Sequence, residues 1–166
     1  MALKPTIFKA QIALADSDRN CFEELSLTVA QHPSETTERM TARIVAYCLH
    51  CARNLEFTRG LSTADEPDLW LRSDAGEILQ WIELGHPDEP RLRKACGRAR
   101  SVTVYTYGKS TDTWWNINGP IVSALPRLQV WQLPWSEIEH TSRLMARTMK
   151  LGISIVGGTV YVDDGN

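Results

Sequence analysis

The chain has 166 residues, of which 43% are hydrophobic and 23% charged, and these ordinary globular values argue against a disordered or fibrous protein. At about 100 to 200 residues per domain, the length predicts a single domain spanning residues 1–166. The 18 Lys and Arg are balanced by 20 Asp and Glu, so the net charge of -2 gives no overall attraction to nucleic acid or to an anionic membrane.

The sequence also predicts the compartment. No apolar run approaches the roughly 18 residues of a membrane span, and residues 1–5 lack the pattern of a signal peptide. The four cysteines follow no secreted disulfide framework and are expected to be reduced thiols: Cys21, Cys48, Cys51 and Cys96. We therefore expect a soluble cytoplasmic protein that does not bind membranes.

The N-terminal residues predict a β-hairpin followed by a helix. Residues 8–14 and 22–30 alternate between apolar and polar side chains around a turn at 16–20, although a short helix would also accommodate 22–30. The helix is predicted over 35–53, with Ser34 as its N-cap.

Glu35 is expected in the first turn of that helix, where its charge favours the helix dipole. Glu38 shares the row that would face a sheet. A second, largely basic arc is expected on the same helix: Arg39, Arg43, Ala46, His50 and Arg53.

The middle of the chain predicts short strands over 57–62 and 68–72, separated by an acidic loop at 65–68. A turn at 74–76 leads to the strongest strand, 78–85, on which Trp81 and Glu83 share a face.

A helix over 89–100 and a strand over 101–107 follow, and a crossover of this length makes 78–85 and 101–107 a parallel pair. From residue 34 to 107 the predicted order is therefore helix, strand, strand, strand, helix, strand.

The last third predicts a helix over 111–125 weakened by Gly119–Pro120, a strand over 128–133 and a helix over 136–147. A closing hairpin is expected to turn at Gly157–Gly158. The expected fold class is α/β with a mixed sheet.

Two carboxylates are candidates for a metal site. Asp68 opens one predicted strand and Glu83 lies in the next, so a folded hairpin would bring them together. Oxygen ligands of this kind hold Mg²⁺, with Mn²⁺ as a substitute, and the metal can activate a water for attack on a phosphodiester. Glu38 could supply a third oxygen. The alternative is that all three are solvated surface carboxylates.

A phosphoryl-transfer site also needs a basic side chain, and this chain lacks one at the expected position on the strand. A lysine two residues after Glu83 would share its strand face, but Gly85 stands there. Arg91 or Lys94 from the following helix is therefore expected to reach into the gap.

The same helix carries a basic row formed by Arg91, Lys94 and Arg98. Such a row can contact the phosphates of a nucleic acid. The alternative is a solvated helix face that Asp88 and Glu89 neutralise.

Other motifs point to no chemistry. Cys48 and Cys51 form a single C-x-x-C without the second ligand pair of a structural zinc site, and no catalytic triad or glycine-rich phosphate loop is recognisable. Tryptophans could stack on bases, although aromatic residues at these spacings are more often part of the core: Trp114, Trp115, Trp131 and Trp135.

Several segments resemble the YaeQ family of Gram-negative bacteria. They are 32–40 (HPSETTERM), 57–61 (FTRGL), 65–68 (DEPD) and 81–85 (WIELG) followed by Pro87–Asp88. The similarity spans nearly the whole chain. It implies that the family extends a little beyond Asn166, so the last strand is expected to be incomplete.

The resemblance implies a variation on the PD-(D/E)xK nuclease fold, a restriction-endonuclease-like core of order α-β-β-β-α-β that agrees with the order predicted above. It also implies acidic site residues at Asp68, Glu83 and Glu38. Gly85 departs from the lysine of the superfamily pattern, and relocation of that cation to Arg91 or Lys94 is our hypothesis.

The expected function is that of a metal-dependent nuclease-fold protein that acts on or binds nucleic acid phosphodiesters. Its expected catalytic residues are Glu38, Asp68, Glu83, Arg91 and Lys94. One alternative is a catalytically inactive module of the same fold that binds nucleic acid or a protein partner. Another is a protein-binding adaptor without nucleic-acid contact. The sequence gives no oligomeric state.

Overall fold

The computed structural model describes residues 3–59 and 65–165, and the chain forms two compact units. The first unit consists of Met1–Cys51 and Glu139–Asn166, and the second of Ala52–Ile138. The single domain expected from the length stays a prediction. Within the described ranges, no helix is both long and apolar enough to cross a membrane.

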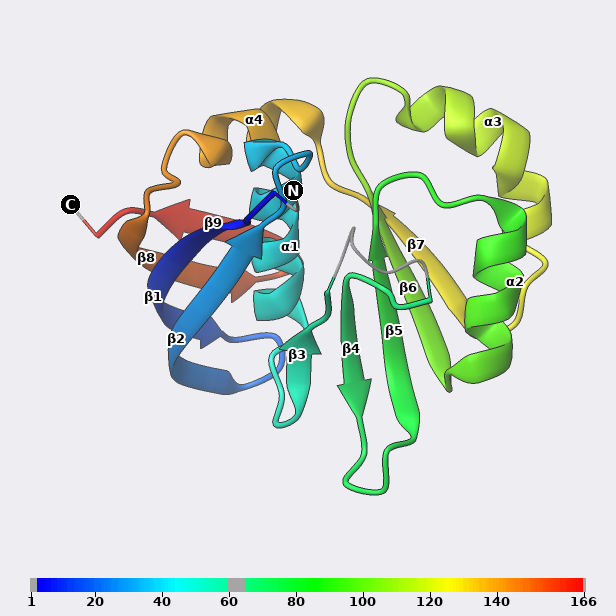
Figure 1. The fold of residues 1–166 in the computed structure, drawn as a ribbon, viewed down its shortest axis with the longest axis horizontal. Helices are drawn as coiled ribbons and strands as arrows, with labels where there is room; N and C mark the ends of the chain where they lie inside the picture. The colour runs from blue at the N-terminus through cyan, green and yellow to red at the C-terminus, as the bar shows by residue number, and fades with distance from the viewer. Residues whose placement is uncertain (1–2, 60–64, 166) are drawn as a thin grey trace. The chain divides into compact units, whose positions relative to one another are not determined.

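The elements follow one another from blue to red in Figure 1. In chain order they are β1 (Thr6–Asp16), β2 (Cys21–Gln31), α1 (Thr37–Leu49), β3 (Leu55–Phe57), β4 (Leu69–Arg72), β5 (Ile78–Leu84), α2 (Glu89–Arg98), β6 (Ser101–Thr106), α3 (Thr111–Val122), β7 (Leu128–Gln132), α4 (Trp135–Ser142), β8 (Thr148–Val156) and β9 (Thr159–Asp163).

The first unit is built on a four-stranded sheet of order β2-β1-β8-β9. β1 pairs antiparallel with β2 and parallel with β8, and β8 and β9 form an antiparallel hairpin. Both terminal hairpins are thus confirmed, and β2 is a strand rather than a short helix. Alternate residues of β1 are buried, as the period-two pattern requires: Ala10, Ile12 and Leu14.

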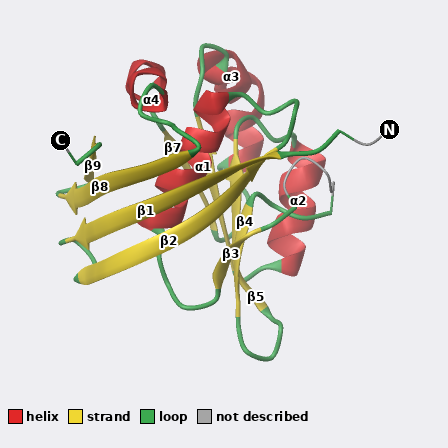
Figure 2. Ribbon diagram, turned by 60° about the vertical axis from the view of Figure 1, so that its left-hand side comes forward, coloured by secondary structure: helices red, strands yellow, loops and turns green. Residues whose placement is uncertain are grey.

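Helix α1 lies against one face of this sheet (Figures 1 and 2). The helix starts later than predicted, because Ser34 is not its N-cap. The Ser34 hydroxyl lies 2.7 Å from the ring Nδ1 of His32, and the Thr36 hydroxyl accepts a hydrogen bond from the amide of Arg39 at 3.1 Å instead. The helix ends at Leu49, earlier than predicted.

Glu35 precedes α1 and is buried, which differs from its expected place in the first helical turn. Arg43 donates to both of its carboxylate oxygens, at 2.9 and 2.5 Å, and Arg39 donates to one at 2.8 Å. Because Arg43 is itself buried, the basic arc predicted for this helix is not an exposed face.

The second unit is built on a five-stranded sheet of order β3-β4-β5-β6-β7. β3, β4 and β5 are antiparallel neighbours, whereas β5-β6 and β6-β7 are parallel. The order α1, β3, β4, β5, α2, β6 confirms the predicted succession, and the parallel pair of β5 and β6 is also confirmed.

β3 covers Leu55–Phe57 rather than 57–62. Its ladder with β4 ends where Phe57 pairs with Leu69, and the hydroxyl of the next residue, Thr58, donates to the carbonyl of Pro67. The last part of the predicted strand, from residue 60 on, lies outside the described residues.

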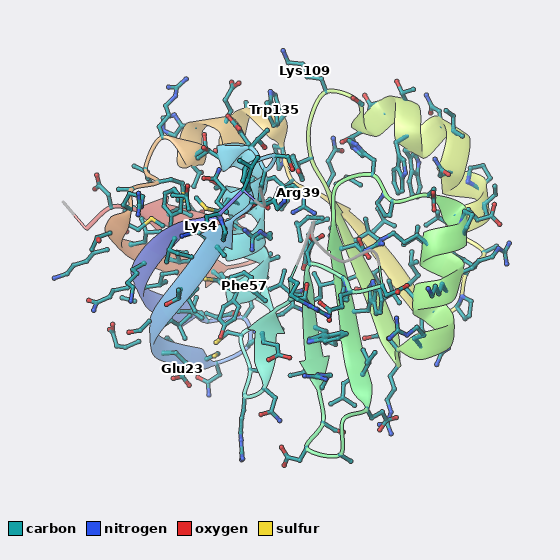
Figure 3. The ribbon with its side chains drawn as sticks, viewed as in Figure 1. Lys4, Glu23, Arg39, Phe57, Lys109 and Trp135 are labelled. Carbon is teal, nitrogen blue, oxygen red and sulfur yellow. The ribbon has the colours of Figure 1, made fainter. Side chains whose placement is uncertain are left out.

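Helices α2 and α3 cover the same face of the five-stranded sheet (Figure 1), and Figure 3 adds the side chains to this view. The core between them is apolar and contains Trp81, Leu92, Ala95, Cys96, Ala99, Val102, Val104, Trp114 and Val122. Trp114 is a core residue as expected. Trp115 and Trp131 are exposed, so the core interpretation is wrong for these two.

Helix α4 is shorter than the predicted 136–147. After Ser142 the chain continues in turns, in which Arg143 bonds to the carbonyl of His140 and Leu144 to that of Thr141. Such bonds to the third preceding residue tighten the chain into a 3₁₀-like turn that does not continue as an α-helix. All four cysteines are free thiols, as predicted.

Candidate active site

Two of the predicted site residues lie beside each other in the second unit. Asp68 directly precedes β4 and Glu83 lies in β5, and each residue is only 4% exposed. Since Leu69 pairs with Ile82 in the antiparallel ladder, the residue before Leu69 lies opposite the residue after Ile82. Asp68 is fixed there by its Oδ2, which accepts a hydrogen bond from the amide of Leu84 at 2.8 Å.

The Glu83 carboxylate is held by two donors on the face of β5 that α2 covers. Its Oε1 accepts from the Trp81 indole and from Nε of Arg91, both at 2.8 Å. Burial raises the pKa of Glu83 to about 7, with a further upward contribution from Asp68 that Arg91 and the Trp81 hydrogen bond oppose. Glu83 can therefore gain or lose a proton near neutral pH.

Helix α2 positions Arg91. The helix begins at Glu89 as predicted, and the side chain of its N-cap, Asp88, accepts from the amide of Arg91 at 3.0 Å. The Arg91 side chain is 31% exposed and the Glu83 side chain 5%, so the guanidinium covers the carboxylate from its solvent side. Of the two cations considered for the gap, Arg91 is the one that contacts Glu83.

The other two residues of the basic row contact the loop that precedes Asp68. Lys94 Nζ lies 2.7 Å from Oδ1 of Asp65, and Arg98 donates to the Asp65 carbonyl at 2.7 Å. The Arg98 guanidinium also lies over the Trp81 ring, 5.2 Å from its centroid. The acid that pairs with Lys94 is therefore in the loop, not on α2 itself.

Gly85 has a backbone conformation that suits glycine. Its φ is +106°, a region that L side chains rarely adopt, and a Cβ built on it would meet no atom within 4 Å. The gap predicted at this position is thus open, but a lysine would strain the backbone there.

Glu38 belongs to the first unit, where it lies half-buried in the first turn of α1. Its role as a third oxygen ligand stays a prediction. Over residues 3–59 and 65–165, no three His, Cys, Asp or Glu side chains come together as a set of metal ligands.

Sequence reasoning missed the partners that surround this pair. The strand pattern predicts the correct face for Trp81 but no role, and it predicts Asp65 and Glu66 only as loop residues. The sequence contains one signal for the contacts of the loop, because the acidic residues at 65–68 and the basic residues of α2 have opposite charges.

Comparison with known proteins gives a consistent family match. The profile of the YaeQ protein family matches residues 1–166. YaeQ of Escherichia coli (strain K12) is 44% identical over 165 residues, which cover 99% of this chain and 91% of that protein.

Solved structures agree. The crystal structure of the YaeQ protein from Xanthomonas axonopodis pv. citri has a TM-score of 0.93 and 41% identity, covering 97% of this chain and 92% of that chain. The structure from Pseudomonas syringae also has a TM-score of 0.93, at 37% identity, covering 97% of this chain and 89% of that one.

Proposed function

The chain belongs to the YaeQ family, and we propose that it is a metal-dependent phosphodiesterase of the PD-(D/E)xK type that acts on nucleic acid. The observation that supports this proposal is the pair of buried carboxylates, Asp68 just before β4 and Glu83 in the adjoining β5, with the Arg91 guanidinium on Glu83. A buried carboxylate with a raised pKa, such as that of Glu83, is typical of catalytic sites when it lies beside a second ionisable group.

The donor set fits a small hard cation. Mg²⁺ is usually held by one or two carboxylates together with waters and substrate phosphates. Asp68 and Glu83 are both fixed by hydrogen bonds from the protein, and a cation would relieve the repulsion that helps to raise the pKa of Glu83. When bound, Mg²⁺ or Mn²⁺ would polarise the phosphate and lower the pKa of a water.

The side chains of this chain would carry out the remaining tasks. Asp68 and Glu83 would hold the cation, and the Glu83 carboxylate can accept a proton from the attacking water. Arg91 can pair with a non-bridging phosphate oxygen and stabilise the charge that develops there. In this proposal Arg91 supplies the cation that Gly85 cannot, because Arg91 contacts Glu83 whereas Lys94 contacts Asp65 in the loop.

The test is cleavage of labelled single-stranded and duplex DNA and RNA with Mg²⁺ or Mn²⁺. The variants Asp68→Asn and Glu83→Gln keep the size of each side chain but remove its charge, so we expect about a hundredfold or greater loss of cleavage with each. Asp112→Asn, in the first turn of α3, removes an exposed carboxylate and should leave cleavage unchanged. Absence of metal-dependent cleavage by the unaltered protein on every substrate would refute the enzymatic proposal.

A second candidate function keeps the fold without catalysis. It is favoured by Gly85, whose positive φ would strain the usual lysine, and by the engagement of Arg91 with Glu83. In that case the protein would bind nucleic acid or a protein partner, and binding would be the same with EDTA as with Mg²⁺. A cytoplasmic location, which the free cysteines favour, is part of both proposals.

A further inference from the structure

The loop before β4 and the basic row of α2 are joined by hydrogen bonds. Lys94 contacts the carboxylate of Asp65, Arg98 donates to the carbonyl of the same residue, and Arg91 donates to the carbonyl of Glu66 at 2.8 Å. The row is therefore occupied by acceptors that belong to this chain.

Only one of these acceptors is a charged group at the surface. The Asp65 side chain is 73% exposed and that of Lys94 is 59% exposed, so water surrounds their contact. An exposed ion pair shifts the equilibrium between its paired and unpaired arrangements by no more than about fivefold. Lys94 can exchange Asp65 for another anion at little cost, whereas the two carbonyl contacts can keep the loop in place.

The chemistry of the exchange favours a phosphate. The neighbouring Lys94, with Arg98 and Arg91 nearby, lowers the pKa of Asp65, which is therefore an anion at neutral pH. An oxygen of a phosphodiester has the same charge and accepts the same kind of hydrogen bond from an ammonium group. A polyanion would in addition release counterions when it binds the row.

We propose that Lys94 and Arg98 form a phosphate-binding site for the backbone of a nucleic acid, and that Asp65 is an internal competitor that occupies Lys94 in the free protein. This inference rests on the proposed function, because it extends the same site along α2 from Arg91. It assigns the acidic loop a second task besides carrying Asp68, which is to weaken binding of any polyanion that does not displace Asp65.

The experiment measures binding of a fluorescently labelled single-stranded DNA 20-mer by anisotropy, with EDTA present to prevent cleavage, at several salt concentrations. Asp65→Asn should tighten binding about two- to fivefold at low salt, since it frees Lys94 from its ion pair. Its plot of log affinity against log salt should be steeper by about 0.7, the contribution of one added phosphate contact. Adding Lys94→Gln to Asp65→Asn should abolish both changes.

Glu77→Gln is the matched control. It removes one negative charge and frees Arg100 from an exposed ion pair of 2.7 Å in the same unit, so any general effect of charge appears there too. Asp65→Ser, which removes the charge with a smaller side chain, should behave as Asp65→Asn does. Binding by Asp65→Asn that is no tighter than that of the unaltered protein or of Glu77→Gln overturns the inference.

Failure of the inference can be told from failure of the proposed function. Tighter binding by Asp65→Asn without cleavage by the unaltered protein supports the phosphate site and refutes the phosphodiesterase. Cleavage that depends on Asp68, with no effect of Asp65→Asn on binding, supports the phosphodiesterase and refutes the phosphate site.

Discussion

Glu83 differs from an exposed glutamate in how tightly it holds its proton. Burial raises its pKa from an ordinary value of 4.5 to about 7, so the folded protein binds this proton more tightly than the unfolded chain does. Asp68 and Arg91 act on the same carboxyl group in opposite directions. The charge state of the candidate site is consequently set by burial first and by these two neighbours second.

This difference makes stability depend on pH. Between about pH 4.5 and 7 the folded state carries the extra proton, so the free energy of unfolding should fall as pH rises, by at most about 1.4 kcal/mol per pH unit. Urea denaturation at half-unit pH intervals measures the slope, and Glu83→Gln should reduce it. Asp112→Asn should retain the slope of the unaltered protein. Equal slopes for Glu83→Gln and the unaltered protein would show that Glu83 has an ordinary pKa.

At the scale of the element, α2 supplies Arg91 through the geometry of its first turn. Asp88 satisfies the amide of Arg91, while the apolar residues Leu92 and Ala95, which are buried in the core, fix the helix on the sheet. The cap and the core contacts together determine where the guanidinium lies.

Removal of this cap should destabilise the protein. Asp88→Ala leaves an amide of the first turn without its acceptor and should lower the free energy of unfolding by about 0.5 to 2 kcal/mol. Ser110→Ala is the control, because Ser110 is the N-cap of α3 but its side chain makes no capping hydrogen bond. Chemical denaturation of both variants measures the difference. A loss for Ser110→Ala as large as for Asp88→Ala would contradict this assignment.

The elements that the sequence predicted well are those whose signals are local. Alternation identified β1, β2 and β5, and residue spacing identified α2 and its row of cations. The N-cap of α1 was mispredicted because Ser34 and Thr36 are equally plausible in sequence, and only the contact of Ser34 with His32 selects Thr36.

The candidate site was predictable only in part, for a related reason. The strand spacing placed Asp68 and Glu83 together, and Gly85 indicated that a cation must come from elsewhere. The choice of Arg91 over Lys94 depends on the partner of Lys94, which is Asp65, 29 positions earlier in the chain. Such a long-range ion pair leaves no periodic trace in the sequence.

At the scale of the whole molecule, the second unit is inserted between the two chain segments of the first. The strands β1 and β8 come from those separate segments and pair with each other. If the inserted unit unfolds, the chain between β1 and β8 becomes a long flexible loop. The entropy cost of closing that loop then makes the pairing of β1 with β8 less favourable.

We therefore expect the two units to unfold together, as the single domain predicted from the length would. Cys48 in the first unit and Cys96 in the second are both buried, and burial raises the pKa of each thiol. Pulsed alkylation at increasing urea, read by mass spectrometry of peptides, should label both at the same midpoint. Cys21, which is partly exposed, serves as the control that reacts before the transition. Two separate midpoints would mean two independent domains.

The parallel pairing of β1 with β8 has a consequence for biosynthesis. Arg147 donates to the carbonyl of Ile7, 140 positions away, and Lys9 pairs with Thr148. A ribosome adds about 5 to 20 residues per second, so one edge of the N-terminal hairpin waits for several seconds before its neighbour emerges. During that interval its unpaired amides and carbonyls are open to pairing with other strands.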